Sequence, residues 1–231
     1  LKPCLDSIRA IDYPNYSVLL IDNGSNDSSG DMVQQNYPEV EILTLDKNYG
    51  FAGGYNRCFT QLKEKSSKFI MLLNNDTTVD QDLLNCFNDA REKFGDNNIY
   101  GGKIYYQDDP ERIWYAGGKV NLKWGHISHL GIRKPDADKY SVVGLTDYVT
   151  GCCLFTSINI IKRLNGFDER FNMYGEDVDI CLRAKKVNIN CYYWPDSKLW
   201  HHVSASFGGA FSIGKFFRKY RSLSKLYFKH I

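Results

Sequence analysis

Runs of apolar residues alternate with segments of helical periodicity along the first hundred residues of the chain. Leu1, Leu5 and Ile8, for example, have the spacing of one helix face. The pattern predicts strands over 17–21, 41–45 and 69–73, and helices over 1–10, about 30–36, and from the glycine-rich stretch at 47–56 to about residue 65. Strands and helices alternating at this spacing predict an α/β fold with a central, mostly parallel sheet flanked by helices.

The pattern changes after residue 100 to short aromatic segments separated by glycine, which suit extended strands and loops. Expected elements are extended segments at 113–118 and 120–124, a strand over 147–155, a short helix over 158–164, a helix over 178–186, and an aromatic run at 192–195 that leads to two histidines. The final stretch, 214–229, has six basic residues, no acidic residue and many aromatic ones. We find no internal repeat.

Composition limits the class of protein. The chain has 231 residues, 43% of them hydrophobic and 24% charged, which indicates one globular catalytic domain rather than a disordered or low-complexity chain. The formal net charge of +2 gives no reason to expect nucleic acid as a partner.

The seven cysteines are scattered without C-x-x-C spacing, so we expect neither a disulfide framework nor a zinc site, and a reducing, cytoplasmic location. No apolar run approaches the roughly 20 residues of a membrane helix, and no signal peptide is recognisable. The chain opens on Leu1 without a methionine, so we expect upstream sequence to be missing.

The third apolar run, 69–73, stops abruptly on Asn74, Asn75 and Asp76. Ligands of open α/β sheets gather beyond the carboxyl ends of such strands. A carboxylate there can bind a divalent cation and leave positions for a diphosphate and water. Asp76 is therefore a candidate metal ligand; the alternative is that it caps a helix beginning near residue 80.

A second acidic cluster, Glu176, Asp177 and Asp179, lies where a helix is expected to begin. Stabilisation of the helix N-terminus alone explains negative charge there. Aromatic residues at 167–174 precede the acids, however, and a carboxyl group held away from water can act as a general base. We favour the catalytic interpretation over capping.

His201 and His202 follow an apolar strand end, where a packed, hydrogen-bonded histidine is the common case. Neutral imidazole can also complete the coordination of a cation or bond a phosphate, and the loop at 204–209 could close over a diphosphate. The glycines of 48–56 match neither a P-loop nor G-x-G-x-x-G, but they permit close backbone approach to a ligand. A plain helix-entry turn is the alternative there.

Five motifs in this order resemble those of family-2 glycosyltransferases, and more narrowly their bacterial rhamnosyltransferase-like branch. They are D-N-G-S-N-D-S from residue 22, N-Y-G-F-A-G-G-Y-N from 48, L-L-N-N-D-T from 72, G-F-D-E-R-F-x-x-Y-G-E-D-V-D-x-C-L-R from 166 and W-H-H from 200. The similarity spans about residues 1–209. Their joint occurrence is far more specific than any one of them.

The resemblance implies a Rossmann-like GT-A fold and transfer of a sugar from a nucleotide diphosphate donor, usually with inversion, using Mg²⁺ or Mn²⁺. The donor is expected to be linked to dTDP, UDP or GDP, with dTDP-rhamnose as one candidate. The acceptor is expected to be a hydroxyl of a bacterial surface glycan or a lipid-linked saccharide. A catalytic domain is implied over 1–209, with a nucleotide-binding half over 1–99 and an acceptor-side half over 100–209.

The resemblance also implies residue roles. Asp177 would be the base that deprotonates the acceptor, and Asp76 and His201 would meet the metal or diphosphate. Acceptor-side residues are expected to be Glu176, Trp114 and Gly151. Expected donor contacts are Asp22 for the base, the loop residues Asn48, Gly50, Gly53 and Asn56, and Asn74 and Asn75 for the ribose and diphosphate.

Two departures from the family pattern matter. Asn74 stands where many members have the first aspartate of D-x-D, which leaves fewer carboxylates for the metal. The first central strand of the family, with its donor-binding loop, is also absent before Leu1.

The basic, aromatic C-terminal helix expected over 210–231 has two interpretations. Residues 214–229 could lie on an anionic membrane at the inner face of the cell, or the helix could pack its aromatics on the core with its lysines in solvent. Two other functions also remain open: a catalytically inactive carbohydrate-binding or scaffold protein of the same fold, and a nucleotidyltransferase.

Overall fold

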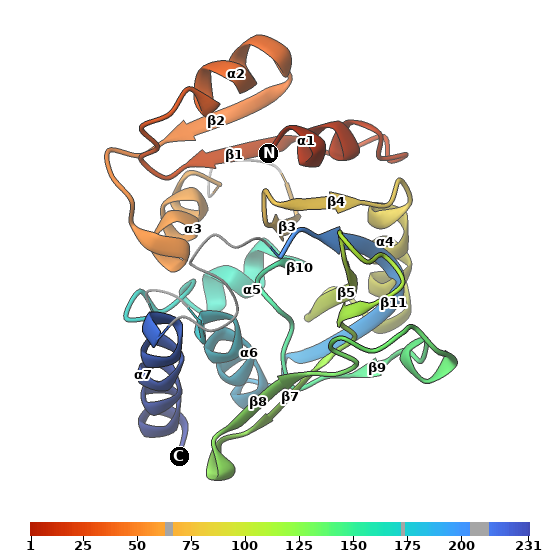
Figure 1. Cartoon of the computed structure of the whole chain (residues 1–231), viewed down its shortest axis with the longest axis vertical. Coiled ribbons are helices and arrows are strands. Elements are labelled where there is room, and N and C mark those ends of the chain that lie inside the picture. Colours follow the sequence, from red (N-terminus) through yellow and green to blue (C-terminus); the bar gives the residue numbers. More distant parts are fainter. Residues whose placement is uncertain (63–66, 172–173, 204–212) are drawn as a thin grey trace.

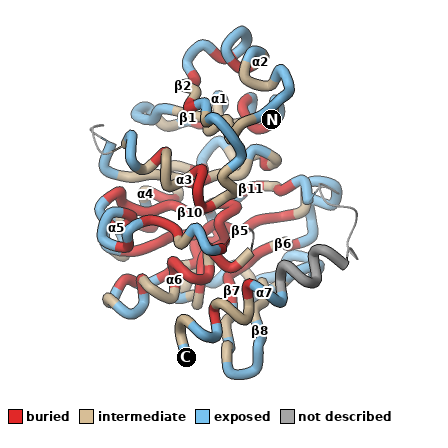
Figure 2. The backbone as a smooth tube through the Cα atoms, turned by 90° about the vertical axis from the view of Figure 1, so that its left-hand side faces the viewer, coloured by how far each residue is buried: buried red, intermediate tan, exposed pale blue. Residues whose placement is uncertain are grey.

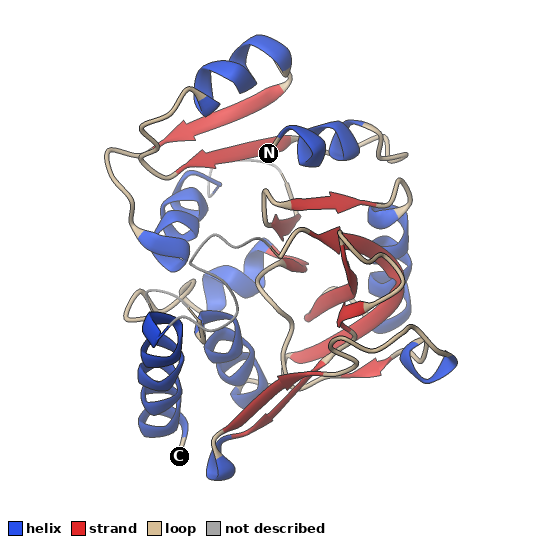
Figure 3. Cartoon of the chain, in the orientation of Figure 1, coloured by secondary structure: helices blue, strands red, loops and turns tan. Residues whose placement is uncertain are grey.

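Two sheets, drawn in red in Figure 3, carry the fold. This computed structural model describes residues 1–62, 67–171, 174–203 and 213–231, and in the last range it describes side chains from Tyr220 onward. A two-stranded sheet consists of β1 (Val18–Asp22) and β2 (Val40–Thr44), which run parallel. A seven-stranded sheet has the order β3-β10-β5-β11-β4, with β6 added to β5 and β9 added to β11.

The strands of the second sheet are β3 (Phe69–Leu73), β4 (Thr77–Val79), β5 (Asn98–Tyr106), β6 (Ile113–Tyr115), β9 (Gly144–Leu145), β10 (Cys153–Ser157) and β11 (Asn190–His201). A separate hairpin pairs β7 (Gly118–Asn121) with β8 (His126–His129), and the short helix η2 (Leu122–Trp124) forms its tip. Figure 1 shows this hairpin projecting away from the sheets, toward the end of the chain.

The helices are α1 (Lys2–Arg9), α2 (Ser29–Asn36), α3 (Gly50–Gln61), α4 (Leu83–Phe94), α5 (Ile158–Arg163), α6 (Glu176–Lys186) and α7 (Ile213–His230), with a further 3-10 turn, η3, at Asp138–Tyr140. Helix α4 packs on β5 and β11, and α1 packs on β4. The buried residues, red in Figure 2, gather along β5, β10 and α6. In the described residues, no helix is long and apolar enough to cross a membrane.

The expected α/β architecture with a sheet flanked by helices is confirmed, and most predicted elements of the first half begin and end within about two residues of the observed ones. The expectation of a mostly parallel sheet needs correction. Among the described strands, only β1–β2 and β5–β11 pair in parallel, whereas β10 runs antiparallel to both of its neighbours and β4 antiparallel to β11. The reason is that β10 lies between β3 and β5 although it follows both along the chain, so strands that alternate with helices in sequence are not neighbours in this sheet, unlike β1 and β2, which α2 joins.

Two element boundaries were also wrong. The strand expected over 147–155 begins only at Cys153, because backbone groups of residues 149–152 bond to side chains and to turn residues instead of to a neighbouring strand. The glycine-rich stretch expected to precede a helix is largely the helix itself, since α3 begins at Gly50. The aromatic run at 192–195 lies inside β11, whose register with β5 shifts between Trp194 and Lys198.

Candidate active site

The polar residues after β3 form the turn that leads into β4. The Thr77 hydroxyl donates to the Asn74 carbonyl over 2.7 Å and so closes this turn. Strand β4 follows immediately, and α4 begins only at Leu83 with Asp82 as its N-cap. The alternative that Asp76 caps a helix near residue 80 is therefore wrong, and its carboxylate is available for another role.

Asp76 meets His201 at this turn. Strand β11 pairs with β4 so that His201 lies opposite Thr77, and Nε2 of His201 is 3.1 Å from Oδ1 of Asp76. The Asp76 side chain is 36% exposed, whereas that of His201 is 10% exposed. Burial raises the pKa of Asp76, but the hydrogen bond and charge of His201 outweigh it, and the net shift is downward. Asp76 is thus held in its ionised form.

His202 plays a different part from its neighbour. Its backbone N–H donates to the Asp76 carbonyl over 2.8 Å, while its ring faces Asp108 at 3.3 Å. Of the two histidines, therefore, His201 is the one whose side chain lies beside the Asp76 carboxylate. Residues 204–209, expected to form a closing loop, lie outside the described residues.

Trp114, on β6, joins this group through ring contacts. Its indole packs edge to face against His201, with ring centroids 4.6 Å apart, and against His129 on its other side at 4.5 Å. The residue is only partly buried. An expected acceptor-side aromatic and an expected metal-side histidine therefore lie in direct contact.

Asp177 lies in the first turn of α6, behind Gly175, which is the N-cap with φ of 92°. Its Oδ2 accepts from the backbone N–H of Gly151 at 3.1 Å, and its Oδ1 from that of Val178 at 2.8 Å. Burial raises the pKa of Asp177, although both of these hydrogen bonds favour the ionised form. The side chain remains partly exposed, as a base that meets a substrate must be.

The other two acids of the cluster have opposite surroundings. Glu176 is 8% exposed, and its Oε2 has no hydrogen-bond partner among the described residues. Burial, followed by the charge of Asp177, raises the pKa of Glu176 to about 8. Asp179 is fully buried but lies within 2.8 Å of side-chain nitrogens of Arg183, Lys229 and His230. Stabilisation therefore explains Asp179, whereas no side chain of the cluster caps the helix.

A short turn connects the two carboxylate groups. Gly151 donates to Asp177, and the carbonyl of the next residue, Cys152, accepts from the backbone N–H of Asn74 at 3.0 Å. The end of β3 and the start of α6 are thus joined through two successive residues. A Cβ atom at Gly151 would lie 2.7 Å from Cζ of Phe51, so α3 approaches the same turn from another side.

The expected donor-side residues form a second group around the start of α3. The Asn48 side-chain oxygen accepts from the N–H of Gly50 at 2.8 Å, and Asn23 bonds to Tyr49 N–H and to the carbonyl of Gly50. At Gly53, a Cβ atom would lie 2.8 Å from Cβ of Tyr49, so only glycine fits there. These contacts bind the loop after β1 to the helix N-terminus.

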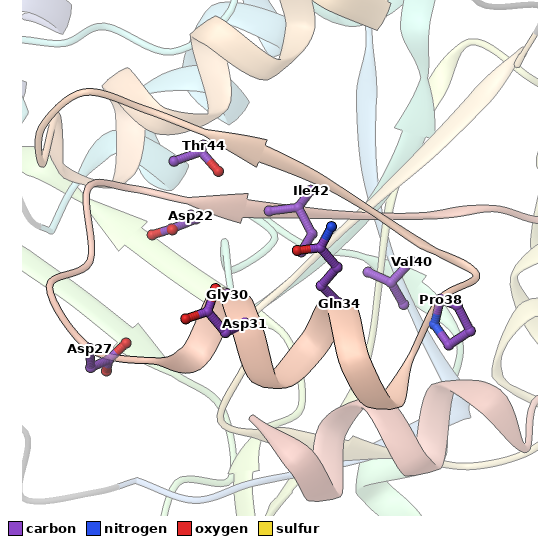
Figure 4. Close-up of a pocket in the computed structure, with 9 residues that line it drawn as sticks. All are labelled: Asp22, Asp27, Gly30, Asp31, Gln34, Pro38, Val40, Ile42 and Thr44. Carbon is purple, nitrogen blue, oxygen red and sulfur yellow. The ribbon is translucent and has the colours of Figure 1, made fainter.

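Asn56 and Asp22 differ from the rest of that group. Both ends of the Asn56 amide bond to the backbone of Phe167, at 2.9 Å each, which gives this residue a bridging role in the fold. Asp22 accepts from the N–H of Ser25 at 2.9 Å and lines an open cavity of about 550 Å³ between β1, β2 and α2. Figure 4 shows the carboxylate of Asp31 on the opposite side of this cavity from Asp22.

Sequence reasoning missed several residues that shape the site: Asn23, Phe51, Cys152 and Lys229. Asn23 lies just beyond the carboxyl end of the strand expected over 17–21, and this position could have marked it as a candidate ligand contact. Cys152 acts through its backbone and Lys229 lies fifty residues from its acidic partner, so no local pattern signals either.

The donor atoms at Asp76 and His201 fit a divalent cation only in part. A carboxylate and an imidazole suit Mg²⁺ or Mn²⁺, which commonly keep positions for phosphate and water. Over the described part of the chain, no three histidine, cysteine or acidic side chains gather closely enough to hold a metal. The remaining positions would therefore belong to the substrate and solvent.

Comparison with known proteins gives consistent findings. The model of the family described as "Glycosyl transferase family 2" matches residues 1–157. The chain is 28% identical over 212 residues to an N-acetylglucosaminyl-diphospho-decaprenol L-rhamnosyltransferase of Mycobacterium tuberculosis, covering 83% of this chain and 68% of that protein. It is 25% identical over 213 residues to rhamnosyltransferase WbbL of Escherichia coli K12, covering 88% of this chain and 78% of the other.

Two solved structures share the fold at low sequence identity. GalNAc-T7 with UDP, GalNAc and Mn²⁺ has a TM-score of 0.67 and 14% identity, over 86% of this chain and 40% of that one. Residues 1–349 of TarS from Staphylococcus aureus in complex with UDP give a TM-score of 0.57 and 15% identity, over 97% and 60% of the respective chains.

The raised pKa of Glu176 predicts a pH-dependent effect of Glu176→Gln on stability. The folded state holds this proton more tightly than the unfolded chain, so ionisation costs stability as the pH rises from about 4.5 toward about 8. We expect the substitution to raise the free energy of unfolding by about 1–3 kcal/mol at the upper end and to change it little at the lower end. Urea denaturation across this range measures the effect. Glu111→Gln, at an exposed position, is the control; equal effects of Glu176→Gln at both ends would contradict the prediction.

Proposed function

Because the chain belongs to glycosyl transferase family 2, and is thus a glycosyltransferase, we propose that it moves a sugar from a nucleoside diphosphate donor to an acceptor hydroxyl with inversion. The GT-A fold expected from the sequence is confirmed by the solved structures that share it. The family assignment also leaves the nucleotidyltransferase alternative without support.

One observation carries the proposal: two carboxylates joined through a single turn have pKa values shifted in opposite directions. The pKa of Asp76 is lowered and that of Asp177 is raised, each for the reasons given above. Such divergence separates a permanently ionised group from one that can exchange a proton. Asp76 therefore suits a cation and Asp177 suits a base.

In the proposed reaction, Asp177 accepts the proton of the acceptor hydroxyl as its oxygen bonds to the anomeric carbon. The bond from that carbon to the diphosphate oxygen breaks, and its electron pair leaves with the nucleoside diphosphate. Asp177 then returns the proton to solvent. When bound, Mg²⁺ or Mn²⁺ at Asp76 and His201 supplies positive charge for the departing diphosphate.

The remaining side chains have positioning roles in this proposal. On the acceptor side, the Trp114 ring offers an apolar face to a sugar beside His201, and the buried Glu176 shapes the site beside Asp177. On the donor side, we assign the base to Asp22 and the ribose and diphosphate to Asn74, Asn75 and the loop at 48–56. An amide at Asn74 in place of a carboxylate leaves less negative charge at the cation.

The donor and acceptor are proposed from the relatives. Both relatives named above are rhamnosyltransferases, which favours dTDP-rhamnose among the dTDP-, UDP- and GDP-sugars. One of them is named for a lipid diphosphate acceptor, which favours a lipid-linked saccharide or a growing surface glycan here. An inactive carbohydrate-binding protein of the same fold is the alternative that activity assays must exclude.

Donor turnover tests the proposed reaction. We expect release of nucleoside diphosphate from one member of a panel of dTDP-, UDP- and GDP-sugars, in the presence of Mg²⁺ or Mn²⁺ and not in EDTA. Asp76→Ala should reduce this release at least roughly a hundredfold, because it removes the proposed carboxylate ligand. Binding of a donor without release would indicate that an acceptor is missing; neither binding nor release would favour the inactive alternative.

Asp177→Asn tests the base directly. The amide keeps the shape of the side chain but cannot accept a proton, so we expect kcat to fall by about 10²–10⁴ while the affinity for donor changes little. Steady-state turnover together with donor binding by calorimetry separates the two quantities. Asp179→Asn is unsuitable as a control because that residue anchors α7, whereas Asp138→Asn, at the exposed start of η3, is suitable. Unchanged turnover in Asp177→Asn would exclude this residue as the base.

We further propose that a lipid-linked acceptor is met at an anionic membrane surface through an aromatic face of α7 and the neighbouring hairpin tip. The aromatic face comprises Trp124, Tyr220, Tyr227 and Phe228, with Ile231 at its end, all exposed. Trp124 and Phe228 are 83% and 85% exposed. Packing joins the two elements, since a Cβ atom at Gly125 would lie 3.3 Å from Leu223. Figure 2 shows α7 beside β8.

Charge favours a bilayer as the occupant of this face. Residues 112–135 and 197–231 contain no aspartate or glutamate, and Lys123 and Arg221 lie beside the exposed aromatics. Aromatic rings with basic neighbours are typical of helices that lie in a membrane interface. The expectation that α7 packs aromatics on the core with lysines in solvent is wrong for Phe228, which is exposed, and for Lys229, which is ion-paired.

Vesicle binding tests the aromatic face. We expect the chain to sediment with vesicles containing phosphatidylglycerol and not with vesicles of phosphatidylcholine alone. Trp124→Ala with Phe228→Ala should weaken binding roughly tenfold or more, because two interfacial rings are lost. Val142→Ala with Leu145→Ala is the matched control, since both residues are 67% exposed on another part of the surface. Equal loss in both double variants, or self-association through the face, would contradict the membrane assignment.

A further inference from the structure

The last turn of α7 contacts the first turns of α6. Nζ of Lys229 is 2.7 Å from Oδ1 of Asp179, and Nε2 of His230 is 2.8 Å from the same oxygen. Lys229 is also 2.6 Å from Oδ2 of Asp168, in the segment that leads to α6. Ion pairs, and not apolar packing alone, therefore hold the end of α7 against α6 and the segment before it.

These contacts differ from ordinary surface ion pairs. The Asp179 side chain is 0% exposed and that of His230 is 4% exposed, so solvent screens them little. Removal of one partner from a buried pair leaves an uncompensated charge. The contact between α6 and α7 is therefore sensitive to the charge at Lys229.

Other contacts place α7 against the backbone just before the two proposed active-site acids. A Cβ atom at Gly175 would lie 3.3 Å from Leu226 and 3.2 Å from Phe171. The Lys225 side chain donates to the Arg170 carbonyl. Gly175 is the N-cap of α6, and Glu176 and Asp177 follow it directly. Helix α7 thus packs on the residues that set the position of both acids.

We propose that Lys229 and His230 are positioning residues for the base: both hold the first turn of α6 in place, and Lys229 offsets the charge of Asp179, two residues from Asp177. This inference rests on the proposed role of Asp177. Neither residue touches a substrate in this proposal. Their effect reaches the reaction through α6.

The charges around both acids support this effect. The titratable groups that interact electrostatically with Asp177 are Glu176, Tyr148, Cys152 and Cys181. Those around Asp179 are Arg183, Lys229, His230 and Arg170. Without Lys229, Asp179 keeps one permanent cation within a salt bridge, Arg183, because burial lowers the pKa of His230 and so disfavours its charged form. The field of Asp179 then disfavours ionisation of Asp177.

Lys229→Met and Lys229→Arg distinguish charge from bulk. We expect Lys229→Met to move the acidic limb of the pH profile of kcat/KM upward by on the order of half a pH unit, and to lower kcat several-fold with KM little changed. Lys229→Arg should restore both toward wild type. Lys185→Met removes an exposed lysine from α6 itself and is the matched control.

A readout that needs no turnover keeps this inference separate from the proposed function. Carboxyl ¹³C NMR, with Glu176 and Asp177 assigned through their amide variants, follows both titrations directly. An upward shift of the Asp177 titration in Lys229→Met supports the inference even where no donor is turned over. In that case only the proposed function fails. Lower thermal stability with unchanged titration and unchanged pH profile would overturn the inference and leave α7 a purely structural helix.

Discussion

The turn at Thr150–Cys152 is the constraint on which the arrangement of the site depends. Within two residues it donates an N–H to Asp177 and accepts one from Asn74, so it ties α6 to the end of β3. A side chain at Gly151 would collide with Phe51, which means that α3 can approach only because this residue is glycine. Three elements distant in sequence therefore converge at one stretch of backbone, and polar groups that would otherwise be buried without partners find them there.

The site places three aspartates in three different electrostatic environments. Asp76 has an imidazole beside it and a partly exposed side chain, Asp177 accepts from two backbone N–H groups, and Asp179 forms ion pairs with Arg183 and Lys229. Burial alone would raise the pKa of all three, so the partners decide the outcome. Charge repulsion between Glu176 and Asp177 adds to burial, and the protein accommodates it by keeping a proton on Glu176. The neighbours of each aspartate, rather than its residue type, therefore determine the direction of its pKa shift.

Local patterns in the sequence were sufficient for the helices and strands of the first half, because each apolar run there is bounded by turn residues. They failed where long-range pairing decides the structure. Residues 147–152 have strand-like composition, yet their backbone groups bond to a loop and to Asp177. Strand direction was equally out of reach, since β10 enters the sheet between β3 and β5 although it follows them by many residues. Motif order singled out Asp76, His201 and Asp177 as candidates, but not the backbone of Cys152 or the cation of Lys229, whose contacts no spacing encodes.

Helix α7 contacts the start of α6 on one face and is exposed on the other. One face of its described portion buries Leu226 against Gly175 and ends in the cations on Asp179, whereas the opposite stripe exposes Tyr220, Tyr227 and Phe228. A helix transmits displacement along its axis with little deformation, because each turn is held by its own backbone hydrogen bonds. Force or orientation imposed on the exposed stripe would therefore reach the first turn of α6. The proposed contact with a lipid surface and the proposed placement of the base are thus properties of one element, and a change to one has consequences for the other.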